Sequence, residues 1–427
     1  MKKFFYYASA FAMALAMTMG FTSCSDDNDG GSDDPKADQL EKVVSQYTNH
    51  VVYPTYTNLA NSSQDLYDQL VALKAKFDAG SLTDQDVKDV CATFLEARAW
   101  WEKSEAFLYG SASDNGIDPH IDSWPLDRAK LAELLGSQDY TKLQGEEGIE
   151  YISNLNDESS WLGFHGIEFI IFRGGNARPA SAFSNNEDDE AFAGKTVNGE
   201  QELTFAIAVA GDLRDYCCWL EASWLGADKV DAAHLARCTK RGFNLLAQGS
   251  DISYGPELID ATNSTKYVTW RGAIGTILDG GCMNICNEVS SQKMGQAYRA
   301  VIGQPDPEDE DGKEYIESPY SHKSFVDFYD NIQSIKNSLY GNIDKTAPEA
   351  NSLMTYLTQH NATLATELQT SLQASFDALN KCQEGPAFVT VINTANAADL
   401  ANVKAAMDAI AELNDKLSEA KDWIQKN

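Results

Sequence analysis

Residues 161–172 of this 427-residue chain read WLGFHGIEFIIF, an apolar run that contains only two ionisable side chains. Such a run is typical of a helix interior. His165 and Glu168 stand three positions apart, so on a helix they point to the same face. Because burying either group without a partner is unfavourable, we expect the pair to contact a metal ion, a substrate or other side chains. Gly163 and Gly166 lower helix propensity but permit close approach of another backbone or a ligand.

The rest of the chain shows the same helical periodicity. Apolar residues recur three and four positions apart, and no segment shows sustained two-residue alternation. We therefore predict an all-α protein built from two consecutive helical bundles. The predicted helices cover residues 38–77 (kinked or divided at Pro54), 84–109, 126–135, 146–155, 161–174, 200–224, 229–247, 269–300, 324–339, 353–379 and 400–417.

An acidic loop at residues 184–190 is the best candidate for a boundary between the two bundles. It assigns residues 37–190 to an N-terminal bundle that carries the His165 helix, and residues 191–427 to a C-terminal bundle. We expect the functional site to lie near the junction of these two domains.

The N-terminus reads as an export and anchoring segment. Residues 1–23 combine Lys2 and Lys3 with an apolar run, as a signal peptide does. Cys24 follows small residues in a pattern that resembles a bacterial lipobox, which makes it the lipidated first residue of the mature chain. The alternative is an ordinary secretory signal with a chance cysteine.

Residues 24–36 are rich in Gly and Asp, which predicts a disordered tether. The acidic run also resembles the surface-export signal of Bacteroidetes lipoproteins. We therefore expect an outer-membrane lipoprotein, on the cell surface or the periplasmic face, that is anchored by its lipid.

The chain carries a formal net charge of −31, and loss of Lys2 and Lys3 with the signal peptide leaves it near −33. This charge argues against nucleic acid or an anionic membrane surface as partners, and it is compatible with cations. The seven cysteines beyond Cys24 show no paired CxxC spacing, which excludes a zinc ribbon. We interpret most of them as small buried thiols in helices, although some could pair outside the cytoplasm.

A second candidate group occupies residues 98–107. Arg98, Trp101 and Glu105 fall near one helix face, and Glu102 is adjacent to it. Charged groups among aromatic rings are satisfied either by one another or by a ligand. The simpler alternative is an Arg98–Glu102 ion pair at spacing i, i+4.

Two loops offer further polar groups. Residues 118–125 contain two prolines and a Trp, and Asp118 or Asp122 could supply an oxygen ligand or merely cap a helix. Residues 316–322 bring Ser, His and Glu together without the Gly-x-Ser-x-Gly context of a serine hydrolase, so a hydrogen-bonding wall facing the first domain is the better interpretation. His234 is read as structural, at an exposed helix start.

These segments, in this order, resemble the imelysin family of bacterial cell-envelope proteins. The resemblance rests on Gly-x-His-x-x-Glu at residues 163–168 and covers nearly all of the mature chain. It is supported by further motifs at residues 52–56, 97–107, 121–127, 280–289 and 317–322.

The resemblance implies an all-α fold of two bundles with the site near their junction. It implies metal ligands at His165, Glu168, Glu102 or Glu105, and Asp122. The family includes iron-regulated proteins and is also filed as a peptidase family, in which Glu168 would be the catalytic base or a ligand. One imidazole among carboxylates suits iron or manganese, with zinc also open.

Three functions are consistent with these residues. The first is binding of a divalent metal ion, iron above all, in iron acquisition with an iron-uptake receptor as partner. The second is a metal-dependent peptidase that uses the same site. The third is a binding module for a small molecule or peptide, whose cleft is lined by Arg98, Trp101, Trp124, Glu317, Ser318 and Ser321.

Overall fold

The computed structural model describes residues 36–155, 160–307, 309 and 312–427. The predicted signal peptide (1–23), Cys24 and nearly all of the tether (24–36) lie outside the described residues. The prediction of an all-α protein is confirmed, because the regular secondary structure of the described residues is helical apart from one two-stranded hairpin. None of its described helices combines the length and apolarity that crossing a bilayer requires.

In chain order the described helices begin with α1 (Ala37–Tyr47), α2 (Tyr53–Asp78), α3 (Asp84–Glu102), α4 (Ser111–Asp114), α5 (Ile117–Ile121), α6 (Arg128–Leu135), α7 (Gly145–Ser153), α8 (Gly163–Ile171), α9 (Gly199–Leu225) and α10 (Ala232–Arg241). Those that follow are α11 (Tyr254–Ile259), α12 (Trp270–Thr276), α13 (Asn284–Asn287), α14 (Gly295–Val301), α15 (Ser324–Tyr340), α16 (Leu353–His360), α17 (Ala362–Gln383), α18 (Phe388–Thr394) and α19 (Ala397–Lys426). Strands β1 (Phe172–Arg173) and β2 (Asn176–Ala177) pair antiparallel.

Short 3-10 and π-helical segments extend several of these helices. The 3-10 turn η2 (Glu105–Phe107) follows α3, and the π-helical segment η1 (Thr48–Val52) joins α1 to α2. Pro54 therefore lies in the first turn of α2, where its missing N–H is tolerated. The π-helical segments η6 (Ile277–Met283) and η7 (Glu288–Lys293) connect α12, α13 and α14 into one long helical stretch.

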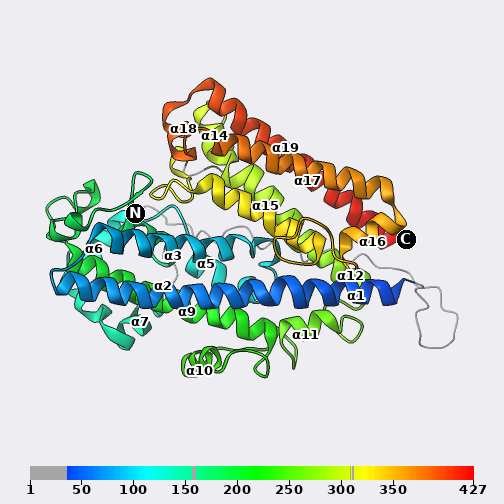
Figure 1. Ribbon diagram of the computed structural model, residues 1–427, viewed down its shortest axis with the longest axis horizontal. Coiled ribbons are helices and arrows are strands. Elements are labelled where there is room, and N and C mark those ends of the chain that lie inside the picture. The colour runs from blue at the N-terminus through cyan, green and yellow to red at the C-terminus, as the bar shows by residue number, and fades with distance from the viewer. Residues whose placement is uncertain (1–35, 156–159, 308, 310–311) are drawn as a thin grey trace. The chain divides into compact units, whose positions relative to one another are not determined.

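Helix α2 packs between α3 and α9, and α8 packs on α9 (Figure 1). Residues Asp38–Asn427 form one compact unit. Helix α9 follows the acidic loop in the sequence, yet it packs along α2, which precedes that loop. The division into bundles 37–190 and 191–427 therefore stays a prediction.

The C-terminal helices α15, α17 and α19 pack together. Figure 1 shows α17 and α19 lying side by side, with α15 packed on α17. Helix α15 also packs on α3, so it carries polar side chains from the C-terminal half to the Arg98 region.

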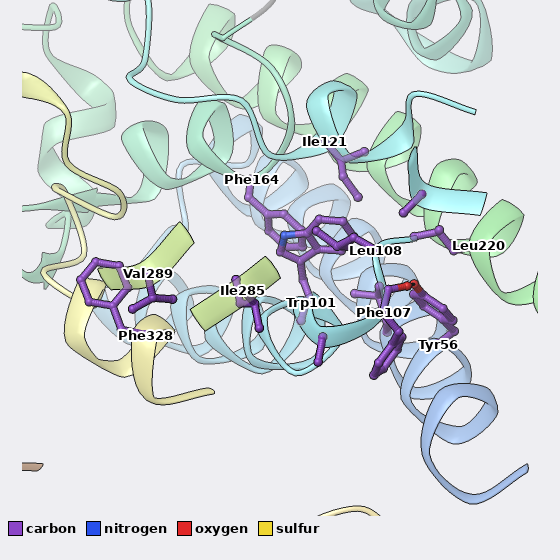
Figure 2. Packing of buried hydrophobic residues seen from close by; sticks show 14 of the residues in the cluster. Tyr56, Trp101, Phe107, Leu108, Ile121, Phe164, Leu220, Ile285, Val289 and Phe328 are labelled. Atoms are coloured by element: carbon purple, nitrogen blue, oxygen red, sulfur yellow. Dashed lines mark hydrogen bonds between the residues drawn. The ribbon is translucent and has the colours of Figure 1, made fainter. Parts of the chain in front are cut away.

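Aromatic and aliphatic side chains surround the candidate site. Figure 2 shows Trp101 and Phe164 lying close together near Ile121, with Ile285 and Val289 arriving from the later helical stretch. The ring centroids of Trp101 and Phe164 are 6.4 Å apart. The site is therefore enclosed by the hydrophobic core, in which electrostatic interactions are stronger than in water.

Candidate metal centre

Eight ionisable side chains that are far apart in the sequence meet in the core, and we call them the central cluster. All are at most 7% exposed. Its members are Arg98 and Glu102 from α3, Glu105 from η2, Asp122 from the end of α5, His165 and Glu168 from α8, Lys293 from η7, and Glu317 from the loop before α15.

Two glycines bring α8 into position, as the sequence predicts. Gly163 has φ +58°, and a Cβ atom there would overlap the backbone of Ile121. A Cβ atom on Gly166 would lie 2.6 Å from the carbonyl oxygen of Trp161. The absence of a side chain at Gly163 therefore lets the start of α8 approach Ile121, the residue before Asp122, and its absence at Gly166 leaves room for the Trp161 carbonyl.

His165 stands between two carboxylates. Its Nε2 lies 3.0 Å from Asp122 Oδ1, and its Nδ1 lies 3.5 Å from Glu168 Oε2. The other Asp122 oxygen accepts a hydrogen bond from Trp101 Nε1 at 2.8 Å. The imidazole is thus oriented by one carboxylate on its own helix and another on a separate element.

Glu168 ties α8 to the loop at residues 316–322. Its Oε1 accepts hydrogen bonds from the backbone N–H of Tyr320 (3.1 Å) and of Ser321 (2.7 Å). The β1–β2 turn supports the same loop, because Gly175 N donates to Tyr320 O at 2.9 Å. Both Glu168 oxygens therefore already face groups of this chain, which fits an orienting role better than a ligand role.

The guanidinium of Arg98 links three carboxylates. Its Nη2 lies 2.5 Å from Glu102 Oε1 and 2.6 Å from Glu317 Oε1, and its Nη1 pairs with Asp122. The predicted Arg98–Glu102 pair is therefore present as part of a larger network. A guanidinium held in this way has little capacity left for a substrate.

Lys293 supplies the second permanent cation. Its ammonium lies 3.1 Å from Glu317 Oε1, 3.7 Å from Glu105 Oε1 and 4.0 Å from Glu102 Oε2. A Cβ atom on Gly281 would overlap the carbonyl oxygen of Ala106, so the helical stretch that carries Lys293 crosses directly over the turn that carries Glu105.

Two carboxylate oxygens of the central cluster, Glu105 Oε2 and Glu317 Oε2, are buried without a hydrogen-bond or ion-pair partner among the described residues. Two further ligand atoms, Glu102 Oε1 and His165 Nε2, each face an ion-pair partner, Arg98 and Asp122 respectively. Donor atoms of Asp122, His165 and Glu317 lie within 4.8 Å of one another, and so do those of Glu102, Glu105 and Asp122. Three carboxylate oxygens and an imidazole nitrogen form a donor set that suits iron, manganese or zinc.

The pKa shifts follow from burial and from neighbouring charges. Burial raises the pKa of Glu102 and Glu105, more than Arg98 and Lys293 respectively lower it. Burial opposes ionisation of Asp122, but Arg98 and His165 hold the pKa of that carboxyl well below its usual range. Burial also disfavours the imidazolium, yet hydrogen bonds to Asp122 and Glu168 raise the pKa of His165 to about 9.

Other predicted site residues lie at the edge of the cluster. Trp124 is half-buried and its ring packs on Tyr315 at 4.2 Å. Ser318 donates its hydroxyl hydrogen to Asp327. The buried hydroxyl of Ser321 has no hydrogen-bond partner in the described chain.

The sequence reasoning missed Lys293, Asp327 and Asn331. Asn331 Nδ2 donates to Glu102 Oε2 at 2.5 Å, and Asp327 Oδ2 lies 3.9 Å from Arg98 Nε. A signal for two of them existed, because Asp327, Asn331, Ser334 and Ser338 make a polar stripe at helical spacing on α15, and all four are buried. No comparable signal marked Lys293, since a lysine in a helix is normally exposed.

The prediction of an exposed His234 is wrong. Its imidazole is buried, and Nδ1 lies 2.5 Å from Glu221 Oε2. The other oxygen of Glu221 accepts a hydrogen bond from Thr57. His234 starts a helix, as predicted, but that helix packs on α9. The interpretation of the cysteines as buried thiols is confirmed for the seven described ones, which are all free.

Comparison with known proteins gives matches over most of the chain. Residues 52–417 match the family model described as Imelysin. Iron-regulated protein A of Synechococcus elongatus is 24% identical over 254 residues, or 60% of this chain. The chain spans about half the length of that relative, 54%.

Two crystal structures share the fold. A candidate iron-regulated protein A precursor from Parabacteroides distasonis aligns with a TM-score of 0.70 and 24% identity, covering 90% of this chain and 95% of that one. An imelysin-like protein from Psychrobacter arcticum aligns with a TM-score of 0.53 and 12% identity, covering 91% and 93%.

Proposed function

The chain belongs to the imelysin family, and from that premise we propose that its central cluster binds one divalent metal ion, with iron as the natural ion. The observation that carries the proposal is a pair of buried carboxylate oxygens without partners among the described residues, Glu105 Oε2 and Glu317 Oε2, beside the closely grouped ligand atoms of Asp122, His165 and Glu317. Such atoms are unfavourable in a core unless a ligand satisfies them.

We assign the ion to the side of the cluster that holds His165. Donor atoms of Asp122, His165 and Glu317 lie within 4.8 Å of one another, so these residues would hold it. Glu317 joins this set from the loop that the sequence linked to substrate binding. The bound ion would supply a Lewis-acidic and, for iron, a redox-active centre.

Glu168 serves as the group that orients His165 in this proposal. Its contacts with the backbone of Tyr320 and Ser321 and with His165 Nδ1 match the carboxylate–histidine–metal arrangement found around protein metal ions. This role differs from the direct ligand role that the family resemblance implies.

Burial favours an ion over a peptide as the ligand. His165 is 2% exposed and Glu317 is not exposed, whereas peptide hydrolysis needs an open cleft beside an activated water. The family's peptidase classification therefore has less support from this site than metal binding does.

The choice of iron rests on the type of ligand atoms and on the name of a similar protein. One imidazole among carboxylates is a hard donor set, and the matched curated relative is named an iron-regulated protein. We further propose that the chain acts in iron acquisition, anchored to the outer membrane through a lipid on Cys24.

Metal analysis of protein purified without chelator tests the central proposal. We expect about one equivalent of metal in the wild type and none in a His165→Ala/Glu168→Ala variant. The matched control is His234→Ala/Glu221→Ala, which removes a second buried His–Glu pair and should keep the full metal load. Equal loads in wild type and site variant would refute the proposal.

Two further measurements separate the other functions. Peptidase activity requires cleavage that a chelator abolishes and added metal restores, and that the His165→Ala/Glu168→Ala variant lacks. Anchoring requires that labelled palmitate enter the wild type but not Cys24→Ser, and that the variant leave the membrane fraction. Unlabelled wild type would exclude the lipid anchor without affecting the metal proposal.

A further inference from the structure

The ammonium group of Lys293 lies among carboxylates that could otherwise hold a metal ion. Its side chain is 2% exposed, and it contacts Glu102, Glu105 and Glu317 at 3.1–4.0 Å. A lysine is rarely buried so completely unless it is paired. Its position therefore needs an explanation in terms of what it neutralises.

The central cluster contains donors for two cations rather than one. One group consists of Asp122, His165 and Glu317, and the other of Glu102, Glu105 and Asp122. A carboxylate shared between two donor groups is the arrangement of two-metal sites, whose ions lie about 3.5–4 Å apart. Lys293 contacts both glutamates of the second group.

The two permanent cations are placed differently. Arg98 reaches both groups, since it pairs with Asp122 and with Glu102, so it does not distinguish between them. Lys293 contacts two carboxylates of the second group, Glu102 and Glu105, but only one of the first, Glu317 at 3.1 Å. No ion pair between Lys293 and Asp122 is found among the described residues. In a core of low dielectric an ammonium and a divalent ion repel each other strongly at short range.

We infer that Lys293 acts as a built-in second cation, which occupies the Glu102–Glu105 half of the central cluster and restricts it to a single metal ion on the His165 side. This inference rests on the proposed metal binding. It predicts that removal of the ammonium converts a one-ion site into a two-ion site.

The backbone around Lys293 fixes the position of its side chain. Lys293 is the last residue of the π-helical segment η7, and Glu288 is the first. π-Helical segments are rare in proteins, and those that occur often lie at functional sites. The close contact of Gly281 with Ala106 holds this helical stretch against the turn that carries Glu105.

The test replaces Lys293 with Met, which has a similar length and no charge, and uses Mn²⁺ alone as the probe. Equilibrium dialysis with metal analysis should give one Mn²⁺ for the wild type and two for Lys293→Met. The two ions bridged by Asp122 should give an exchange-coupled electron paramagnetic resonance spectrum. Lys293→Arg keeps a cation and should bind one.

Lys421→Met is the matched control. In the described part of the chain Lys421 forms one ion pair, with Asp279 at 2.9 Å, so its removal should leave the Mn²⁺ stoichiometry at one. If Lys293→Met binds one ion while the wild type binds one, the inference is overturned and the proposed function stands. If the wild type binds none, the proposed function itself fails.

Folding of the variant supplies a second readout. Loss of the ammonium leaves Glu102, Glu105 and Glu317 without this partner, so Lys293→Met should melt at a lower temperature than the wild type in chelator. Mn²⁺ should restore the melting temperature, because the second ion replaces the lost charge. A variant that stays destabilised or unfolded in saturating Mn²⁺ would contradict the inference.

Discussion

The backbone of Gly163 lies directly against the carbonyl group of Ile121, so that a Cβ atom at residue 163 would overlap it. This contact joins the first residue of α8 to the residue before Asp122. It sets the 3.0 Å separation between His165 Nε2 and Asp122 Oδ1. With φ at +58°, the position favours glycine both for its conformation and for its lack of a side chain.

Gly163→Ala should therefore destabilise the protein by about 2–4 kcal/mol, from backbone strain and overpacking together, and should weaken metal binding. Urea unfolding and metal titration measure the two effects. Gly145→Ala is the control, because Gly145 also starts a helix with φ +64° but has open space around it. It should lose about 1–2 kcal/mol from strain alone and keep its metal affinity. Equal losses of stability and of metal affinity in the two variants would show that the Ile121 contact does not contribute.

Glu168→Gln should lower metal affinity by about 10–100-fold with little loss of stability. The amide oxygen can still accept the N–H groups of Tyr320 and Ser321, but the amide nitrogen cannot accept a hydrogen bond from His165. Isothermal titration of metal-free protein measures the change. Glu221→Gln alters the equivalent contact with His234 and should bind metal as the wild type does. Complete loss of binding in Glu168→Gln would favour Glu168 as a direct ligand.

Arg98→Lys should destabilise metal-free protein by about 3–5 kcal/mol, the usual effect of breaking a buried ion-pair network. One ammonium cannot replace two guanidinium nitrogens that together reach Asp122, Glu102 and Glu317. Chemical unfolding in chelator provides the measurement. The control is Arg299→Lys, at a partly exposed Arg–Asp309 pair, which should change stability by less than about 1 kcal/mol. A similar small change for Arg98→Lys would contradict the network's importance.

Glu202 should make stability depend on pH. Burial raises its pKa to about 7, although Arg178 opposes the shift. A carboxyl whose pKa is higher in the folded state contributes stability at low pH, and that contribution is lost as pH rises from about 4.5 to 7. Glu202→Gln cannot ionise, so its stability relative to the wild type should improve by up to about 3 kcal/mol between pH 4.5 and 8.

Urea unfolding of both proteins at pH 4.5 and pH 8, in chelator, measures this difference. A pH-independent difference for Glu202→Gln would show that the carboxyl ionises normally in the folded protein.

Local sequence was sufficient for the helices and for part of the site. The spacing of apolar residues predicted most helices, because a buried helix face must recur every three to four residues. The pairing of His165 with Glu168, and the role of two glycines beside them, also follow from one short segment. The family resemblance, confirmed over residues 52–417, added Glu102, Glu105 and Asp122 from other segments.

Tertiary structure decided which side chains share the core of the site. Glu317 Oε1 contacts both Lys293, 24 residues away, and Arg98, 219 residues away. No local pattern encodes such contacts, because they depend on how α3, η7 and α15 pack. The same packing gives both oxygens of Glu168 partners within the chain, which supports the orienting role proposed for it.

The sequence by itself thus determined an all-α fold and a helix that carries His165 and Glu168 on one face. It also determined the acidic charge of the chain, and it predicts that the chain is exported. Only the tertiary structure decided that Lys293 enters the carboxylate group and that Glu317 joins Asp122 around the imidazole. The physical reason is that periodicity specifies which face of a helix is buried, whereas the balance of charge within a core depends on every element that reaches it.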